Sequence, residues 1–203
     1  MAFTATVIGC TEWGAVPAKV GAFSPTTPRW VVVHHTAHPN PPNDVSKRTL
    51  DGAFALAKSI QNDHMNKNGW YDSGHNFLNT TAGFLLEGRH GSREAAIAGR
   101  GIQSAHAPQS SGKLAGGNNS HGIENEGNFM TAQMAPEQWS SLVELCASLC
   151  SSCVLAPTAI KGHRDFTATA CPGDWLYAQL PKLRLEVAQR LNITLTETEA
   201  KNV

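Results

Sequence analysis

A histidine and a cysteine with the spacing of metal ligands stand in the segment 161–174. His163 and Cys171 are eight residues apart in a loop that leads into a Pro-Gly helix start, and nitrogen and sulfur ligands suit a borderline-soft ion such as zinc. The third ligand is expected from the apolar run 30–33, which ends in His34 and His35, because a buried strand that ends in polar residues is a rigid platform. Three protein ligands leave one position of zinc open for water, as catalysis requires.

The two adjacent histidines are not expected to ligate together. Successive side chains of a strand point to opposite faces of the sheet. His34 and His35 therefore face away from each other, and only one of them reaches the metal. The alternation alone does not decide which one.

The length and charge of the chain limit the class of protein. Its 203 residues are enough for one domain with a real core and too few for two comfortable ones. The 16 basic and 16 acidic residues give zero net charge without a basic stripe, so no nucleic-acid partner is expected. No apolar run approaches the roughly 20 residues of a membrane span, and the N-terminus lacks the basic and apolar regions of a signal peptide.

The chain has five cysteines. With Cys171 as a ligand, Cys10, Cys146, Cys150 and Cys153 remain, and the last three have a helical spacing that rarely fits disulfide geometry. These four are expected to be buried free thiols. A bond between Cys10 and one of the others is left open.

Hydrophobic periodicity predicts strands that alternate with helices. Strands are expected at 4–8, 30–34, 74–78, 84–87 and 122–128, with a hairpin around 80–83. Helices are expected at 49–66, from 136 to about 149, and from 174 to about 191 with an interruption at Pro181. The segments 39–43 and 91–119 are expected to be loops that wall a cleft, and 192–203 to be a frayed tail. The prediction is an α/β fold, a single domain over 1–191 with a central mixed β-sheet flanked by α-helices.

Short motifs follow one another along nearly the whole chain. They lie at 12–15 (Glu-Trp-Gly-Ala), 33–37 (Val-His-His-Thr-Ala), 64–70, 74–78 (Gly-His-Asn-Phe-Leu), 87–89, 105–107, 122–124 (Gly-Ile-Glu), 162–165 (Gly-His-Arg-Asp) and 171–177. In this order they resemble the type 2 N-acetylmuramoyl-L-alanine amidases and the related peptidoglycan-recognition proteins and phage lysozyme-amidases. The resemblance implies hydrolysis of the amide between the lactyl group of N-acetylmuramic acid and L-alanine, with peptidoglycan or muropeptides as substrate.

The resemblance also assigns roles to individual residues. It places Zn²⁺ on His34, His163 and Cys171, and so chooses His34 over His35. It implicates Thr169, two residues before the third ligand, in stabilising the tetrahedral intermediate. His75 stands where the animal and phage members carry a tyrosine, and an imidazole there can donate a hydrogen bond or carry a proton.

A carboxylate is needed beside the zinc. Hydrolysis requires a base that takes a proton from water and passes it to the leaving nitrogen, and Glu124 is the first choice, since a carboxylate within a strand has no packing value and since the Gly-Ile-Glu motif resembles that of the wall-recycling amidases. Glu126, two residues on and on the same face, is the second choice. The alternative is that Glu124 is a solvent-facing strand residue without a catalytic role.

Substrate recognition needs several polar groups around the metal. The residues expected to contact the substrate or support its cleft are His35, Asn76, Arg89, His106 and Asn119. Asp165 is expected either to orient a ligand imidazole or to cap its own loop.

Three hypotheses follow. The first is a zinc amidase, expected to be a monomer. The second is a peptidoglycan-recognition module without catalysis, ranked lower because members of that kind commonly lack the cysteine ligand. The third is a structural zinc closed by His35 as a fourth ligand. A phage endolysin, a cytosolic recycling enzyme and a secreted mature enzyme are all left open as settings.

Overall fold

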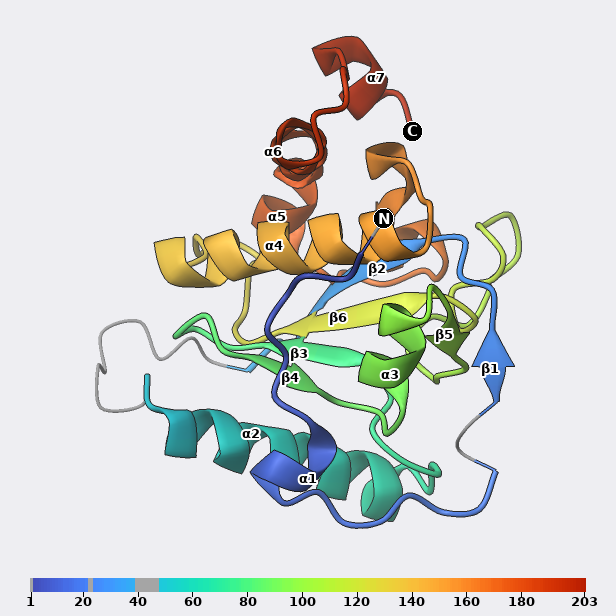
Figure 1. Cartoon of the computed structure of the whole chain (residues 1–203), viewed down its shortest axis with the longest axis vertical. Helices are drawn as coiled ribbons and strands as arrows, with labels where there is room; N and C mark the ends of the chain where they lie inside the picture. The colour runs from blue at the N-terminus through green and yellow to red at the C-terminus, as the bar shows by residue number, and fades with distance from the viewer. Residues whose placement is uncertain (1, 22–23, 39–47) are drawn as a thin grey trace.

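A central sheet of five strands has the order β4-β3-β6-β2-β7 (Figure 1). Its strands are β2 (Val31–His35), β3 (Phe77–Asn79), β4 (Leu85–Glu87), β6 (His121–Asn125) and β7 (Ile160–Gly162). The neighbours β3, β6, β2 and β7 are parallel, and β4 is antiparallel to β3. The computed structural model describes residues 2–21, 24–38 and 48–203. It confirms the predicted α/β fold with a mixed sheet, and the predicted hairpin.

Helices cover both faces of this sheet. Helix α4 (Pro136–Ser152) lies over one face, with α5 (Asp174–Ala178) and α6 (Leu180–Arg190) beyond it, and α2 (Leu50–Asn62) and α1 (Cys10–Trp13) lie on the other (Figure 1). The larger apolar core lies on the α4 side and includes Val31, Val33 and Ile123. The smaller core on the α2 side includes Trp13, Ala57 and Leu78.

The alternation of side chains along β2 and β6 sends polar residues to both sides. Val33 and Ile123 enter the α4 core, so the next residues, His34 and Glu124, leave the opposite face. The predicted ligand His34 and the predicted base Glu124 therefore lie on the same face, and His35 lies on the other.

The predicted helices are present. The first begins at α2, where Thr49 accepts a hydrogen bond from the Gly52 amide, and continues as a π-helical turn, η2 (Asp63–Lys67). The last is divided into α5 and α6, and Pro181 stands in the first turn of α6, where a missing N–H costs nothing. The structure also contains two short 3-10 turns that were not predicted, η3 (Pro157–Ala159) and η4 (His163–Asp165).

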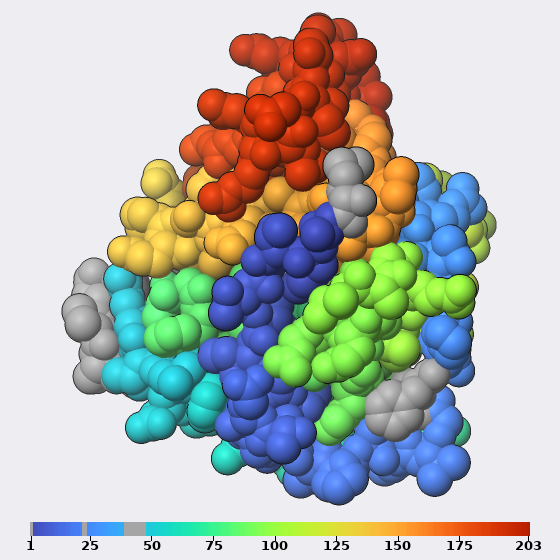
Figure 2. Space-filling view, viewed as in Figure 1, coloured from blue at the N-terminus to red at the C-terminus, as the bar shows by residue number. Residues whose placement is uncertain are grey.

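The strand expected at 4–8 is wrong. Its residues form only one bridge to the sheet, between Ile8 and Leu86. The Ala5 amide donates instead to Ser148 Oγ of α4, at 2.8 Å. The segment therefore runs across the edge of the sheet and connects β4 with α4, and parts of it lie on the surface of the molecule (Figure 2).

The segment 91–119 is not all loop, and the tail is not frayed. The former contains α3 (Ser92–Ile97) and β5 (Gly101–Ile102), which pairs with β1 (Pro25–Thr26). The tail contains α7 (Glu197–Lys201), and Arg184 of α6 donates to the Ala200 carbonyl at 2.8 Å. Strand β7 was not predicted. The expected loop at 39–43 lies outside the described residues. No helix among the described residues is long and apolar enough to cross a membrane.

Candidate metal centre and active site

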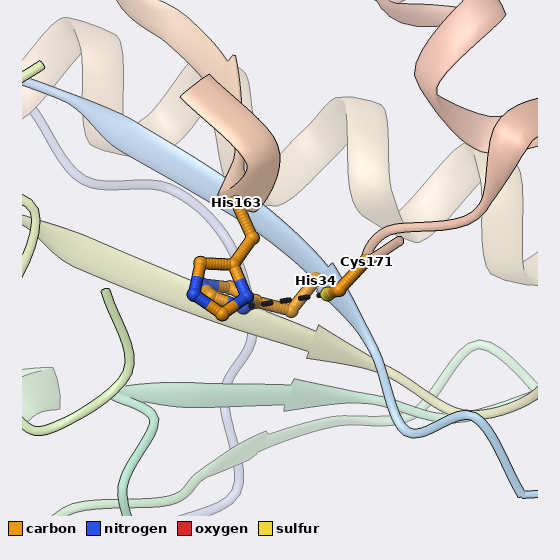
Figure 3. A group of neighbouring side chains, drawn as sticks. All are labelled: His34, His163 and Cys171. Carbon is orange, nitrogen blue, oxygen red and sulfur yellow. Dashed lines mark hydrogen bonds between the residues drawn. The ribbon is translucent and has the colours of Figure 1, made fainter. Parts of the chain in front are cut away.

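Three segments bring the predicted metal ligands together (Figure 3). His34 comes from β2, His163 from η4 directly after β7, and Cys171 from the loop before α5. One ligand atom of each lies within 4.8 Å of the others, and His34 Nδ1 is 3.7 Å from Cys171 Sγ. The ends of neighbouring parallel strands therefore supply two of the three groups.

The three residues fit zinc. His163 Nε2 is buried and has no hydrogen-bond partner in the described part of the chain, which is costly unless a ligand satisfies it. Burial, and next to it the Glu124 charge, raises the pKa of Cys171 to about 12. Burial, followed by the charge of His75, lowers the pKa of His163 to about 4. Neutral imidazoles and a thiol that ionises only beside a cation form the donor set of a zinc site.

His35 points away from this group. Its Nδ1 accepts a hydrogen bond from the Phe129 amide at 3.2 Å, on the α4 side of the sheet. Among the described residues, the metal-binding group contains His34 and lacks His35. No fourth protein ligand of the kind that a closed structural site needs is present in that group.

A carboxylate and an imidazole lie beside the metal group. His75 Nε2 and Glu124 Oε2 are in close hydrogen-bond contact, and the His75 ring packs edge-on against the His34 ring, with centroids 4.7 Å apart. Burial alone would raise the pKa of Glu124, but the charge and hydrogen bond of His75 outweigh it, and the net pKa is lowered. Glu124 is therefore a buried carboxylate that stays ionised, as a general base requires.

Glu126, the second choice for the base, has another task. Its Oε2 accepts hydrogen bonds from the amide and the hydroxyl of Thr81, at 2.8 and 2.7 Å, in the turn between β3 and β4. Asp165 caps its own loop: it accepts from the Gly162 amide at 2.9 Å and from the Tyr177 hydroxyl at 2.6 Å.

Thr169 lies close to the third ligand. Its Oγ1 accepts from the Cys171 amide at 3.2 Å, which leaves its own hydroxyl proton for another acceptor. Thr169 also lines a shallow groove of about 290 Å³ with Lys113 and Arg164. Its hydrogen bond with the Cys171 amide caps this loop.

The residues expected to contact substrate are placed very differently from one another. Asn76 and Arg89 are buried and bonded to the protein: Asn76 holds the Gly122 amide at 2.9 Å, and Arg89 donates to the Ser73 carbonyl at 2.8 Å. Asn119 is exposed. His106 is buried against His34, with 2.9 Å between His106 Nδ1 and His34 Nε2.

His64 also lies at the site, although no role was predicted for it. A pocket of about 120 Å³ is lined by Thr36, His38, Ile60, Asp63, His64 and Glu124. His64 Nδ1 accepts from the Gly74 amide at 2.9 Å, and burial, followed by the charge of His75, lowers the pKa of His64 to about 4. Its Nε2 therefore carries the ring proton of a neutral imidazole. The motif at 64–70, which contains His64, could have indicated it as a site residue.

The fold is therefore an α/β layer structure with a mixed sheet, which carries a candidate metal-binding group of two histidines and one cysteine beside a buried carboxylate. The family model for N-acetylmuramoyl-L-alanine amidase matches residues 24–174, and the chain belongs to this amidase family.

Similar proteins include both recognition proteins and an amidase. Peptidoglycan recognition protein 1 of Bos indicus is 29% identical over 175 residues, which cover 85% of this chain and 80% of that protein. An N-acetylmuramoyl-L-alanine amidase of Sus scrofa is 28% identical over 203 residues, 93% of this chain but 30% of that protein. The structure of bumblebee PGRP-SA superimposes with a TM-score of 0.69 at 26% identity, over 87% of this chain and 94% of that one.

Proposed function

We propose that the protein is a zinc-dependent N-acetylmuramoyl-L-alanine amidase that hydrolyses the lactyl–L-alanine amide of peptidoglycan or muropeptides. One observation carries the proposal: Glu124 and His75 lie beside the His34–His163–Cys171 group. A metal-binding group alone would also be explained by a structural zinc site, and a carboxylate alone by a solvent-facing strand residue. The two together supply what amide hydrolysis needs.

The reaction moves one proton from water to nitrogen. The water oxygen bonds to the amide carbon, the C–N bond breaks, and the stem peptide leaves with a free amino group on its L-alanine. Bound at the three ligands, zinc would act as a Lewis acid toward the carbonyl and acidify water. Glu124 takes the water proton on its carboxylate and delivers it to the leaving nitrogen.

His75 and Thr169 act at the same reaction centre in this proposal. His75 holds the Glu124 carboxylate in place through its Nε2. Its ring packs against the ring of the proposed ligand His34, so a carbonyl bound at the metal would lie near it. Thr169, with a hydroxyl proton not used by the loop, donates to the oxygen on which negative charge develops. The pocket lined by His64 and Glu124 would receive part of the substrate on the Glu124 side of the site.

The test is the release of amino-terminal L-alanine from purified sacculi, counted with and without a zinc chelator. New amino termini that disappear with the chelator and return with added zinc support the proposal. The second candidate, a binding module, is favoured by the similarity to peptidoglycan recognition protein 1. Binding to sacculi without any release, in zinc-loaded protein, would establish the module and reject the amidase.

The physical form of the substrate is tested in the same assay. Release from intact sacculi is compared with release from small soluble muropeptides at equal concentrations of the amide. Faster turnover of polymer points to lysis or remodelling of the wall, and faster turnover of fragments to recycling.

A further inference from the structure

His106 lies directly behind the metal ligand His34. Both side chains are buried, at 4% and 1% exposure, and their rings meet edge to face, with centroids 4.8 Å apart. His34 Nε2 is 2.9 Å from His106 Nδ1, and His106 Nε2 is 3.1 Å from the Ser120 carbonyl oxygen. Ser120, His106 and His34 are therefore joined by a continuous series of hydrogen bonds that ends at the metal site.

The Ser120 carbonyl fixes the direction of every hydrogen bond in this series. A carbonyl oxygen only accepts, so His106 Nε2 donates to Ser120. A neutral imidazole has one N–H, so His106 Nδ1 accepts, and His34 Nε2 donates to it. The single proton of the His34 ring is then on Nε2. Its Nδ1, 3.7 Å from Cys171 Sγ, keeps a free lone pair that faces the other ligands.

The surroundings hold His106 in this position. The amide of the next residue, Ala107, donates to Asn118 Oδ1 at 2.7 Å, and the Ala105 amide donates to the Gly74 carbonyl at 3.0 Å. The ring lies against Gly122 of β6, where a Cβ atom would come within 2.5 Å of His106 Cδ2. Both rings are buried beside a further imidazole, with the His75 ring centroid 4.7 Å from that of His34 and 5.9 Å from that of His106, and such surroundings favour the uncharged form of each ring.

We propose that His106 is a positioning residue of the metal centre: by accepting from His34 Nε2 it keeps the His34 proton off Nδ1 and so presents Nδ1 as the ligand atom. This role differs from the substrate contact expected from the sequence, and it rests on the proposed metal site. Partners of this kind set the tautomer and orientation of a ligand histidine and typically contribute 10–100-fold in metal affinity, as an order of magnitude.

Two measurements test the proposal in the full chain. The first is the ¹⁵N spectrum of the imidazole rings in metal-free protein, with His34 assigned by comparison with a His34→Gln variant. His34 is expected to show the Nε2–H tautomer in the native chain and to lose this preference in His106→Leu. This readout needs neither zinc nor substrate, so a failure of the amidase proposal leaves its outcome unaffected.

The second measurement is the zinc dissociation constant, from competition with a chelator. His106→Leu is expected to weaken binding by roughly 10–100-fold. His106→Asn, which places an amide oxygen near the site of Nδ1, is expected to keep most of the affinity. His121→Leu is the matched control, because His121 is a fully buried histidine of the neighbouring strand β6 whose Nε2 faces Cys153 and not the metal group. Its zinc affinity is expected to be unchanged.

The results that overturn the proposal are specific. An Nδ1–H tautomer of His34 in the native metal-free chain does so, and so does native zinc affinity in His106→Leu. Equal losses in His106→Leu and His106→Asn also overturn it, since packing and not the acceptor would then be responsible. If His106→Leu does not fold, the native spectrum and the His106→Asn affinity decide.

Discussion

His34 and Glu124 are register partners on the adjacent parallel strands β2 and β6. Their side chains therefore leave the same face of the sheet at the same level, which places the candidate base beside a candidate ligand. The next residue of β6, Asn125, points to the other face, and its side-chain amide donates to the His34 carbonyl at 2.8 Å. The site depends on this register, because a slip of one residue would exchange His34 for His35.

The role of Glu124 is tested by Glu124→Gln. The substitution keeps the shape of the side chain and removes its basicity, so turnover is expected to fall by roughly 10²–10⁴-fold, with zinc still bound. Glu126→Gln is the matched control, because Glu126 serves the turn at Thr81. Near-native turnover in Glu124→Gln, or an equal loss in Glu126→Gln, would contradict the assignment.

His75 is tested by comparing His75→Phe with His75→Tyr. Phenylalanine keeps the ring but has no group to bond Glu124, so turnover is expected to fall by roughly 10²-fold. Tyrosine restores a hydroxyl donor and is expected to recover part of the loss. The assay is amide release at saturating zinc. Equal activity of the native chain and His75→Phe would leave His75 without a role.

Zinc affinity is expected to rise with pH. The pKa of Cys171 is raised to about 12 by burial and by Glu124, so the metal-free thiol is protonated at neutral pH and zinc must displace one proton. The dissociation constant is expected to fall about tenfold for each unit between pH 6 and 8. Cys171→Ser is expected to abolish tight binding, and Cys153→Ser to leave it unchanged. A dissociation constant that is flat across this range would reject thiolate ligation.

The stability of the metal-free protein is expected to fall with acid, and His121 contributes to this loss. Burial lowers the pKa of His121 to about 4, below the unfolded value of about 6.5. Between these values the unfolded chain binds a proton that the folded chain does not, so stability decreases as pH falls from about 6.5 to 4. His121→Leu is expected to flatten this limb by about one proton in urea unfolding curves. The exposed His38, changed to Gln, is the control, and an unchanged slope in His121→Leu would contradict the account.

Arg184 is expected to hold the last helix and β7 together. Its guanidinium donates to the Ile160 carbonyl at 2.9 and 2.7 Å and to the Ala200 carbonyl at 2.8 Å. Arg184→Met leaves these buried acceptors unpaired, so a loss of about 1–3 kcal/mol is expected from each unsatisfied group. Arg190→Met, at the exposed end of α6, is expected to change little. Thermal unfolding measures both, and equal melting temperatures would contradict this role.

Periodicity predicted the layers of the fold because the long elements have clear apolar faces. It failed where tertiary contacts decide. Strand β7 has three residues and no period of its own, and the chain at 4–8 gives its Ala5 amide to α4 instead of a neighbouring strand. The tail helix α7 did have a local signal, the capping box of Thr196 and Glu199.

The candidate site also contains residues that the sequence indicated and residues that only tertiary contacts placed. Residue types and motif order indicated His34, His163 and Cys171, and the structure brings them together. The sequence could not reveal that Asn76 and Arg89 are consumed by internal hydrogen bonds. Nor could it place His106 behind His34, since 72 residues separate the two and only the packed sheet joins them.

The central claim is a three-residue zinc site with one open position, and X-ray absorption at the zinc edge of the loaded protein tests it most directly. The account predicts one zinc per chain with one sulfur at about 2.3 Å, two imidazole nitrogens at about 2.0–2.1 Å and one further oxygen. Every variant that still binds zinc is expected to keep this oxygen ligand. A shell of three nitrogens and one sulfur would mean that His35 or another histidine closes the site, and it would contradict the hydrolase.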